Sequence, residues 1–173
     1  ATAEMKQDFN FAVMPRYWVD RSEVENRLAG KWDRKWFSGF RDVTNSVSER
    51  TAIFSLLPRV AVGHKAPLLF SDQSNLTLHS LLLANFNSLV FDFVTRQKVG
   101  GTSLSFFILK QLPVIPPETY TEADINFIAP RVLELTYTAW DIKPFADDLW
   151  SSAVEEWFSR ERRVGEKGSS EVD

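Results

Sequence analysis

The chain has 173 residues, 44% of them hydrophobic and 13% aromatic, and a formal net charge of -3. This composition is enough for one domain with a hydrophobic core, and it excludes disorder of the whole chain. Cysteine is absent, which excludes disulfides and thiolate metal sites. No apolar run reaches the roughly 18 residues that span a bilayer. No secretory signal pattern opens the sequence, so we expect a cytoplasmic protein without membrane contact.

Charge is distributed unevenly along the chain. Residues 146–173 carry eight acids and four bases, whereas residues 27–65 carry eight bases and three acids. The bases of the second window are Arg27, Lys31, Arg34, Lys35, Arg41, Arg50, Arg59 and Lys65. Because phosphate contacts depend on local charge, this window predicts a basic face. Such windows also occur on ordinary solvated surfaces, so both interpretations stay open at this point.

The first half of the chain predicts short strands and one short helix. Residues 9–19 favour a strand broken or ended at Pro15. Asp20 can cap a helix over Glu23–Leu28, and Gly30 would end it. Further strands are expected at residues 36–44, 51–57, 60–62 and 67–70, with a polar turn at 45–49.

A long apolar segment follows. Asn75 or Thr77 can cap a helix that runs to about Lys98, because apolar residues recur at spacings of three and four. These residues are Leu78, Leu81, Leu82, Phe86, Leu89, Val90 and Phe93. Gly100 suits the left-handed residue that follows a helix. A strand is expected at residues 104–109, and it is followed by an extended Pro-rich segment at 113–117.

The C-terminal part predicts helices. Thr121 and Asp124 have the spacing of a capping box, and the helix that they begin would kink or restart at Pro130. Helical segments are expected at 131–140 and 146–163, before a mobile charged tail. The fold class that follows is α+β, with a mixed β-sheet packed on a long buried helix.

Three segments resemble a known family. They are residues 41–51 (RDVTNSVSERT), 100–117 (GGTSLSFFILKQLPVIPP) and 130–141 (PRVLELTYTAWD). In this order they resemble the target recognition domain of fused restriction-modification and phage-defence adenine DNA methyltransferases, the type IIG and type I specificity-like proteins. This domain is the module that reads DNA sequence. The resemblance covers about residues 15–148.

The resemblance also implies a domain organisation and partners. It implies a lead-in at residues 1–10, a target recognition domain at 11–118, closing helices at 119–160 and a charged tail at 161–173. The implied partners are double-stranded DNA and a methyltransferase domain of the same polypeptide. S-adenosylmethionine is implied only for that catalytic domain, and we expect no cofactor in this chain.

The polar loop between two predicted strands is the expected reading head. Arginine can donate two hydrogen bonds to guanine, asparagine can pair with adenine, and hydroxyl groups suit phosphates and base edges. The expected DNA contacts of this loop are Arg41, Thr44, Asn45, Ser48, Arg50 and Thr51. The alternative is a solvated hairpin in which Arg41 and Arg50 pair with Asp42 and Glu49.

Two further groups are candidate DNA contacts. His64 and Lys65 lie in a predicted turn, where a histidine can contact a base or phosphate or can simply be surface. Lys98, Thr102 and Ser103 close the long helix and can clamp a phosphate. Cations at a helix C-terminus also favour the helix dipole without any ligand.

Catalysis is not expected of this chain. Residues 115–118 lack the polar and aromatic positions of the adenine methyltransferase motif, and no Gly-rich loop suits a nucleotide. Asp124, Asp141 and Lys143 have a spacing seen in metal nucleases, but such triplets arise readily by chance. His64 and His79 without cysteine do not make a zinc site.

The main alternative function is a protein-interaction or scaffolding domain. Aromatic side chains would then dock other domains of a parent enzyme. The candidates are Trp32, Trp36, Phe37, Phe40, Trp150, Trp157 and Phe158. The four within residues 32–40 can also stack on bases, although core packing is favoured at their spacing.

Overall fold

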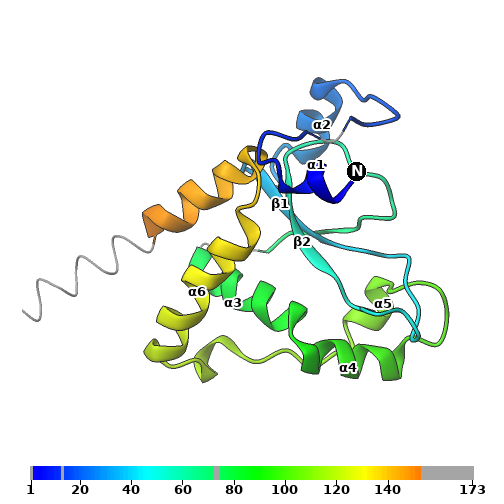
Figure 1. Cartoon of the computed structure of the whole chain (residues 1–173), viewed down its shortest axis with the longest axis vertical. Coiled ribbons are helices and arrows are strands. Elements are labelled where there is room, and N and C mark those ends of the chain that lie inside the picture. Colours follow the sequence, from blue (N-terminus) through cyan, green and yellow to red (C-terminus); the bar gives the residue numbers. More distant parts are fainter. Residues whose placement is uncertain (1, 13, 72–74, 153–173) are drawn as a thin grey trace, which may run out of the picture.

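The computed structural model describes residues 2–12, 14–71 and 75–152 and has an α+β fold (Figure 1). Its strands are β1 (Trp36–Phe40), β2 (Phe54–Pro58) and β3 (Leu68–Leu69). Its α-helices are α1 (Ala3–Gln7), α2 (Arg21–Leu28), α3 (Leu76–Asn87), α4 (Leu89–Lys98), α5 (Phe106–Leu109) and α6 (Glu122–Thr136). Short 3-10 helices occupy Pro117–Thr119 and Trp140–Ile142, and residues 143–152 form a last described helix.

The sheet of the described chain is antiparallel throughout, in the order β2-β1-β3, rather than mixed as predicted. Every residue of the central strand β1 is buried. Pro58 ends the edge strand β2 opposite Trp36, a position that tolerates the missing N–H. The predicted strands at 60–62 and in the described residues of 9–19 are absent, because these segments lie largely exposed without a neighbouring strand.

The outer edge of β2 is protected by a side chain. The Asn87 carboxamide oxygen accepts a hydrogen bond from Phe54 N (3.1 Å), and its nitrogen donates to Phe54 O (3.1 Å). The carboxamide thereby takes the place of a further strand residue, and it blocks the edge against pairing with another chain. This contact also fixes the end of α3 against the sheet.

The predicted long helix is two helices, α3 and α4, that meet at a bend of 59°. Asn75 caps α3 as predicted, but the chain becomes extended at Ser88. The Ser88 hydroxyl accepts a hydrogen bond from Phe91 N (3.1 Å), so Ser88 ends one helix and begins the next. Serine is a strong N-cap residue, and this local preference overrides the continuous apolar pattern.

Two predictions for residues 100–109 are wrong. Gly100 has no left-handed backbone, and among described residues only Gly30 has a positive φ, of 70°. Residues 106–109 form the helix α5, not a strand, because Ser105 caps the turn by accepting from Ile108 N. A single bridge between Val43 and Ser103 is all the strand pairing in this segment.

The C-terminal predictions are partly confirmed. Thr121 and Asp124 form the predicted capping box, and α6 runs through Pro130 without restarting. It ends at Thr136, before the predicted end at Trp140. The helix predicted from residue 146 begins at 143, and its continuation beyond 152 and the charged tail lie outside the described residues.

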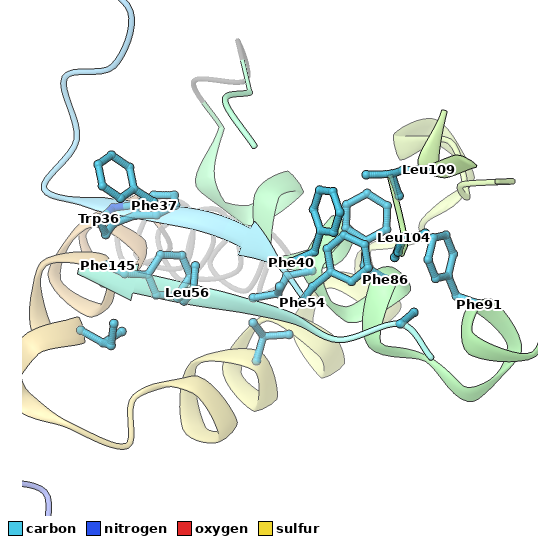
Figure 2. Packing of buried hydrophobic residues seen from close by; sticks show 14 of the residues in the cluster. Trp36, Phe37, Phe40, Phe54, Leu56, Phe86, Phe91, Leu104, Leu109 and Phe145 are labelled. Carbon is cyan, nitrogen blue, oxygen red and sulfur yellow. The ribbon is translucent and has the colours of Figure 1, made fainter. Parts of the chain in front are cut away.

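Aromatic side chains fill the core between the sheet and the helices (Figure 2). Phe54 stacks on Phe86, with ring centroids 4.3 Å apart, and Phe91 meets both rings edge-on. At the start of β1, Trp36 packs edge-on against Phe145 at 4.9 Å. Trp32, Trp36, Phe37 and Phe40 are all buried, so these side chains serve the core, and neither base stacking nor docking through them fits the structure.

Candidate nucleic-acid interface

Three segments that are distant in sequence meet where β1 ends. Beyond Phe40, Asp42 N donates to Lys65 O (3.1 Å) and Thr44 N donates to Thr102 O (3.1 Å). Leu104 N donates to Asp42 O (2.7 Å). These contacts end β1 four residues earlier than predicted, because the chain changes its hydrogen-bond partners from strands to loops. We call residues 41–51, 63–66 and 98–104 the loop cluster.

Asp42 lies at the centre of the loop cluster, and the sequence had suggested a different partner for it. Its carboxylate accepts a hydrogen bond from Lys65 Nζ at 2.9 Å. The bond from Lys65, assisted by the Ser103 hydroxyl, holds the pKa of Asp42 below its ordinary value despite partial burial. Asp42 thus connects Lys65 and Ser103, which the sequence suggested as members of two separate groups of candidate DNA contacts.

Asp92 of α4 is buried beneath the loop cluster and accepts hydrogen bonds that fix the loop backbone. It is 4% exposed. Its Oδ1 accepts from Thr51 N and Ala52 N, both at 2.8 Å, and its Oδ2 accepts from Arg96 Nε at 2.9 Å. Burial raises its pKa, but the hydrogen bonds from Ala52, Arg96 and Thr51 outweigh that effect and hold the pKa below the ordinary value. A charged Asp92 thus fixes the end of the 41–51 loop.

The arginines of the 41–51 loop bind the protein's own backbone. Arg41 Nη2 donates to Arg50 O (2.7 Å), and Arg50 Nη2 donates to Asn87 O (2.7 Å). Arg50 Nε lies 3.6 Å from an Asp92 oxygen. From α4, Arg96 donates to the carbonyls of Ser46 and Glu49. The alternative pairing with Asp42 and Glu49 is therefore wrong, whereas base contacts by these side chains stay a prediction.

Hydroxyl side chains of the same loop also form hydrogen bonds within the protein. Thr44 and Thr51 are buried, and Thr51 Oγ1 donates to Asn45 O at 3.0 Å. The Asn45 side-chain oxygen accepts from Val47 N (3.0 Å) and from the Ser48 hydroxyl (3.0 Å). Thr44 and Thr51 therefore cannot reach a ligand without unfolding of the loop, whereas Asn45 lies at the surface.

Most exposed residues of the loop cluster are polar, although Val43 and Val47 are exposed too, and the cluster carries a net positive charge. Its exposed polar residues include Arg41, Asn45, Ser46, His64, Lys65, Lys98 and Thr102. The cations in the cluster and directly beneath it are Arg41, Arg50, Lys65, Arg96 and Lys98, and the carboxylates are Asp42, Glu49 and Asp92. This excess of cations over carboxylates can attract an anion such as a phosphate group.

The basic window at 27–65 does not form one face. Arg59 pairs with Glu25 at 2.6 Å, and Arg34 pairs with Asp148 at 3.5 Å. Lys31 and Lys35 are exposed before β1, at the strand end opposite Arg41. A five-residue strand separates its two ends by about 15 Å. Only the bases after β1 therefore belong to the loop cluster.

An apolar groove lies away from the loop cluster. It has a volume of about 480 Å³ and lies between β2, α3 and α6. At its rim the Arg131 guanidinium stacks on the Phe127 ring at 3.7 Å. Among the described residues that line the groove, Arg131 is the one titratable side chain.

Two of the residues considered for catalysis have partners on their own helices. The Asp124 carboxylate caps its own helix by accepting from Thr121 N at 2.8 Å. Lys143 pairs with Asp147 one helical turn away. Within the described ranges, no three His, Cys, Asp or Glu residues group as metal ligands.

No single helix in the described part of the chain is long and apolar enough to cross a membrane. The pair α3 and α4 reaches that length and composition only together, across its 59° bend. Comparisons with protein-family models, curated proteins and solved structures find no match to this chain.

Proposed function

We propose that the loop cluster binds double-stranded DNA and contributes to the recognition of its sequence. The observation that carries this proposal is the convergence of three loops on one exposed polar surface. Base recognition requires donors and acceptors at fixed positions, and the contacts of Asp92, Arg50 and Arg96 hold the loop backbone in place. The resemblance to target recognition domains of adenine methyltransferases supports the same proposal.

The proposal divides the predicted site residues into two roles. Thr44, Arg50 and Thr51 position the loop, because their side chains face the protein. Arg41, Asn45, His64, Lys65, Lys98 and Thr102 are the residues exposed toward a ligand. Ser48 and Ser103 join the positioning group through their bonds to Asn45 and Asp42.

A salt titration of DNA binding tests the proposal. The probe is a fluorescent duplex pool with a randomised core, measured by anisotropy. If the exposed cations Arg41, Lys65 and Lys98 each contact one phosphate, log K against log salt should fall with a slope of about -3. The double variant K65Q/K98Q should reduce the slope to about -1. Its matched control, K31Q/K35Q, removes equal charge at the other end of β1.

The control shows whether a loss of DNA binding comes from the cations of the loop cluster or from the total charge of the protein. The proposal expects K31Q/K35Q to bind nearly as the unmodified protein does. Equal loss in both double variants would indicate attraction without a defined surface. Binding that is absent, or independent of salt, would contradict the proposal.

A second candidate function is protein docking through α4. This helix buries Phe91, Asp92 and Thr95 against the core, but it also exposes the apolar residues Leu89, Val90 and Phe93 to solvent. Exposed apolar patches mark interaction surfaces. Sedimentation velocity at rising concentration should show association that L89K/F93K abolishes. A chain that stays monomeric at every concentration, with no binding of an apolar dye, would contradict this second function.

A further inference from the structure

Val47 occupies the tip of the loop cluster and is 87% exposed. Its neighbours Ser46 and Ser48 are polar, and the turn otherwise presents hydroxyl, carboxamide and charged groups. Val47 makes no contribution to the core, so folding alone does not account for an apolar side chain there. Val43 of the same loop is 50% exposed, but Val47 is the most exposed large hydrophobic residue of the described chain, and hydrogen bonds hold the loop around it.

The backbone around Val47 is fixed from both sides. Its own N–H donates to the Asn45 carboxamide oxygen at 3.0 Å. The carbonyls on either side of it, of Ser46 and Glu49, accept hydrogen bonds from Arg96. A valine side chain has few rotamers. Its two methyl groups are therefore presented to the solvent in a defined direction at low entropic cost.

We propose that Val47 contacts the 5-methyl group of a thymine in the major groove. This inference rests on the proposed function. The thymine methyl is the apolar group that a base edge offers in that groove, and apolar side chains recognise it there. Side chains that wedge between base steps are usually longer, so a short branched side chain on a tight turn favours contact with a base edge. Exposed cations on the same surface, Arg41 and Lys65, would engage the flanking phosphates.

The test removes the 5-methyl group of thymine from the DNA and, separately, the two methyl groups of Val47 from the protein. Duplexes enriched by the full 173-residue chain from a randomised pool are resynthesised with deoxyuridine at each thymine in turn. Deoxyuridine pairs as thymidine does but lacks the 5-methyl. At one position we expect a loss of affinity of about three- to five-fold, the factor for one buried methyl group. V47S should lose the same factor on thymine and show no further loss on deoxyuridine, whereas V47I should keep the discrimination.

The matched control is V19S, which changes the same residue type at 56% exposure before α2, outside the loop cluster and outside the exposed face of α4. It should discriminate thymine from deoxyuridine as the unmodified chain does. Equal affinity of the unmodified chain for every thymine and deoxyuridine duplex would overturn the inference and leave DNA binding intact. Discrimination that persists in V47S would overturn it as well. A pool from which no duplex is enriched would contradict the proposed function and this inference together.

Discussion

Asp92 shows how one buried carboxylate can organise a surface loop. It accepts two backbone N–H bonds from the loop and one bond from Arg96, which itself reaches two loop carbonyls. A buried charge is tolerated only when it is paired and hydrogen-bonded. The loop conformation and the charge of Asp92 therefore depend on each other.

Replacing Asp92 with Asn should destabilise the protein by about 2–4 kcal/mol, because Arg50 and Arg96 lose their partner and two buried N–H groups lose a charged acceptor. Urea unfolding measures the change. Asp147→Asn is the matched control, since Asp147 pairs with Lys143 at the surface, and it should have little effect. A D92N variant as stable as the unmodified protein would show that the loop holds its shape without this residue.

His79 provides a test by pH. Burial, and then repulsion from Arg34, lowers the pKa of His79 to about 4, and its ring is hydrogen-bonded to Ser38 Oγ at 2.6 Å. The unfolded chain binds the proton near pH 6.5, so stability falls as pH drops from 7 to 5, by about 2 kcal/mol. Urea unfolding across this range should show the loss, and His79→Gln should flatten it. Equal slopes in both proteins would contradict a neutral, buried His79.

The sequence indicates which polar residues lie in the candidate site, but it does not indicate what their side chains bind. Residues 41–51 stand out by composition, and they do form the exposed loop. Their arginines were expected to face DNA because nothing in that segment shows what lies beneath it. Asp92 and Arg96 lie more than 40 residues further along the chain, within a segment that reads simply as an apolar helix. The acid at the centre of the site, Asp42, was interpreted only as a local ion-pair partner.

At the scale of elements, helix caps determine where helices begin and end in segments whose apolar pattern is ambiguous. Ser88 divides one predicted helix into two, and Ser105 converts a predicted strand into a helical turn. Both serines are visible in the sequence as cap candidates. Whether a cap is used depends on tertiary contacts, such as that of Asn87 with β2, which the sequence does not reveal. The cap residues of α2 and α6 were predicted correctly, whereas the restart of α6 at Pro130 and its end at Trp140 were not.

Two glycines should respond differently to substitution. A Cβ on Gly39 would lie 2.9 Å from Pro67 O and 3.2 Å from a Leu57 methyl, whereas a Cβ on Gly100 would meet nothing within 4 Å. Gly39→Ala should therefore cost about 1–3 kcal/mol through strain between β1 and its neighbours. Gly100→Ala should leave the melting temperature nearly unchanged. The reverse order would mean that Gly100, as the sequence suggested, is the constrained position.

At the scale of the whole molecule, three exposed regions can be distinguished. The loop cluster lies where β1 ends, the exposed lysines 31 and 35 precede the strand, and the apolar face of α4 is exposed to solvent. Net charge alone would not suggest DNA binding, because the chain is acidic. What matters for the proposed function is which of the basic residues share a surface: Arg59 pairs with Glu25 outside the loop cluster, whereas Lys65 pairs with Asp42 within it.

The most direct test of the proposed DNA surface is to map the contact by NMR. Backbone amide shifts of the isotope-labelled chain would be followed as an enriched duplex is added. The account predicts that the largest changes cluster at residues 41–51, 63–66 and 98–104, with small changes at Lys31, Lys35 and along α6. Changes concentrated on α4 at Leu89, Val90 and Phe93, or no changes at a saturating duplex concentration, would contradict it.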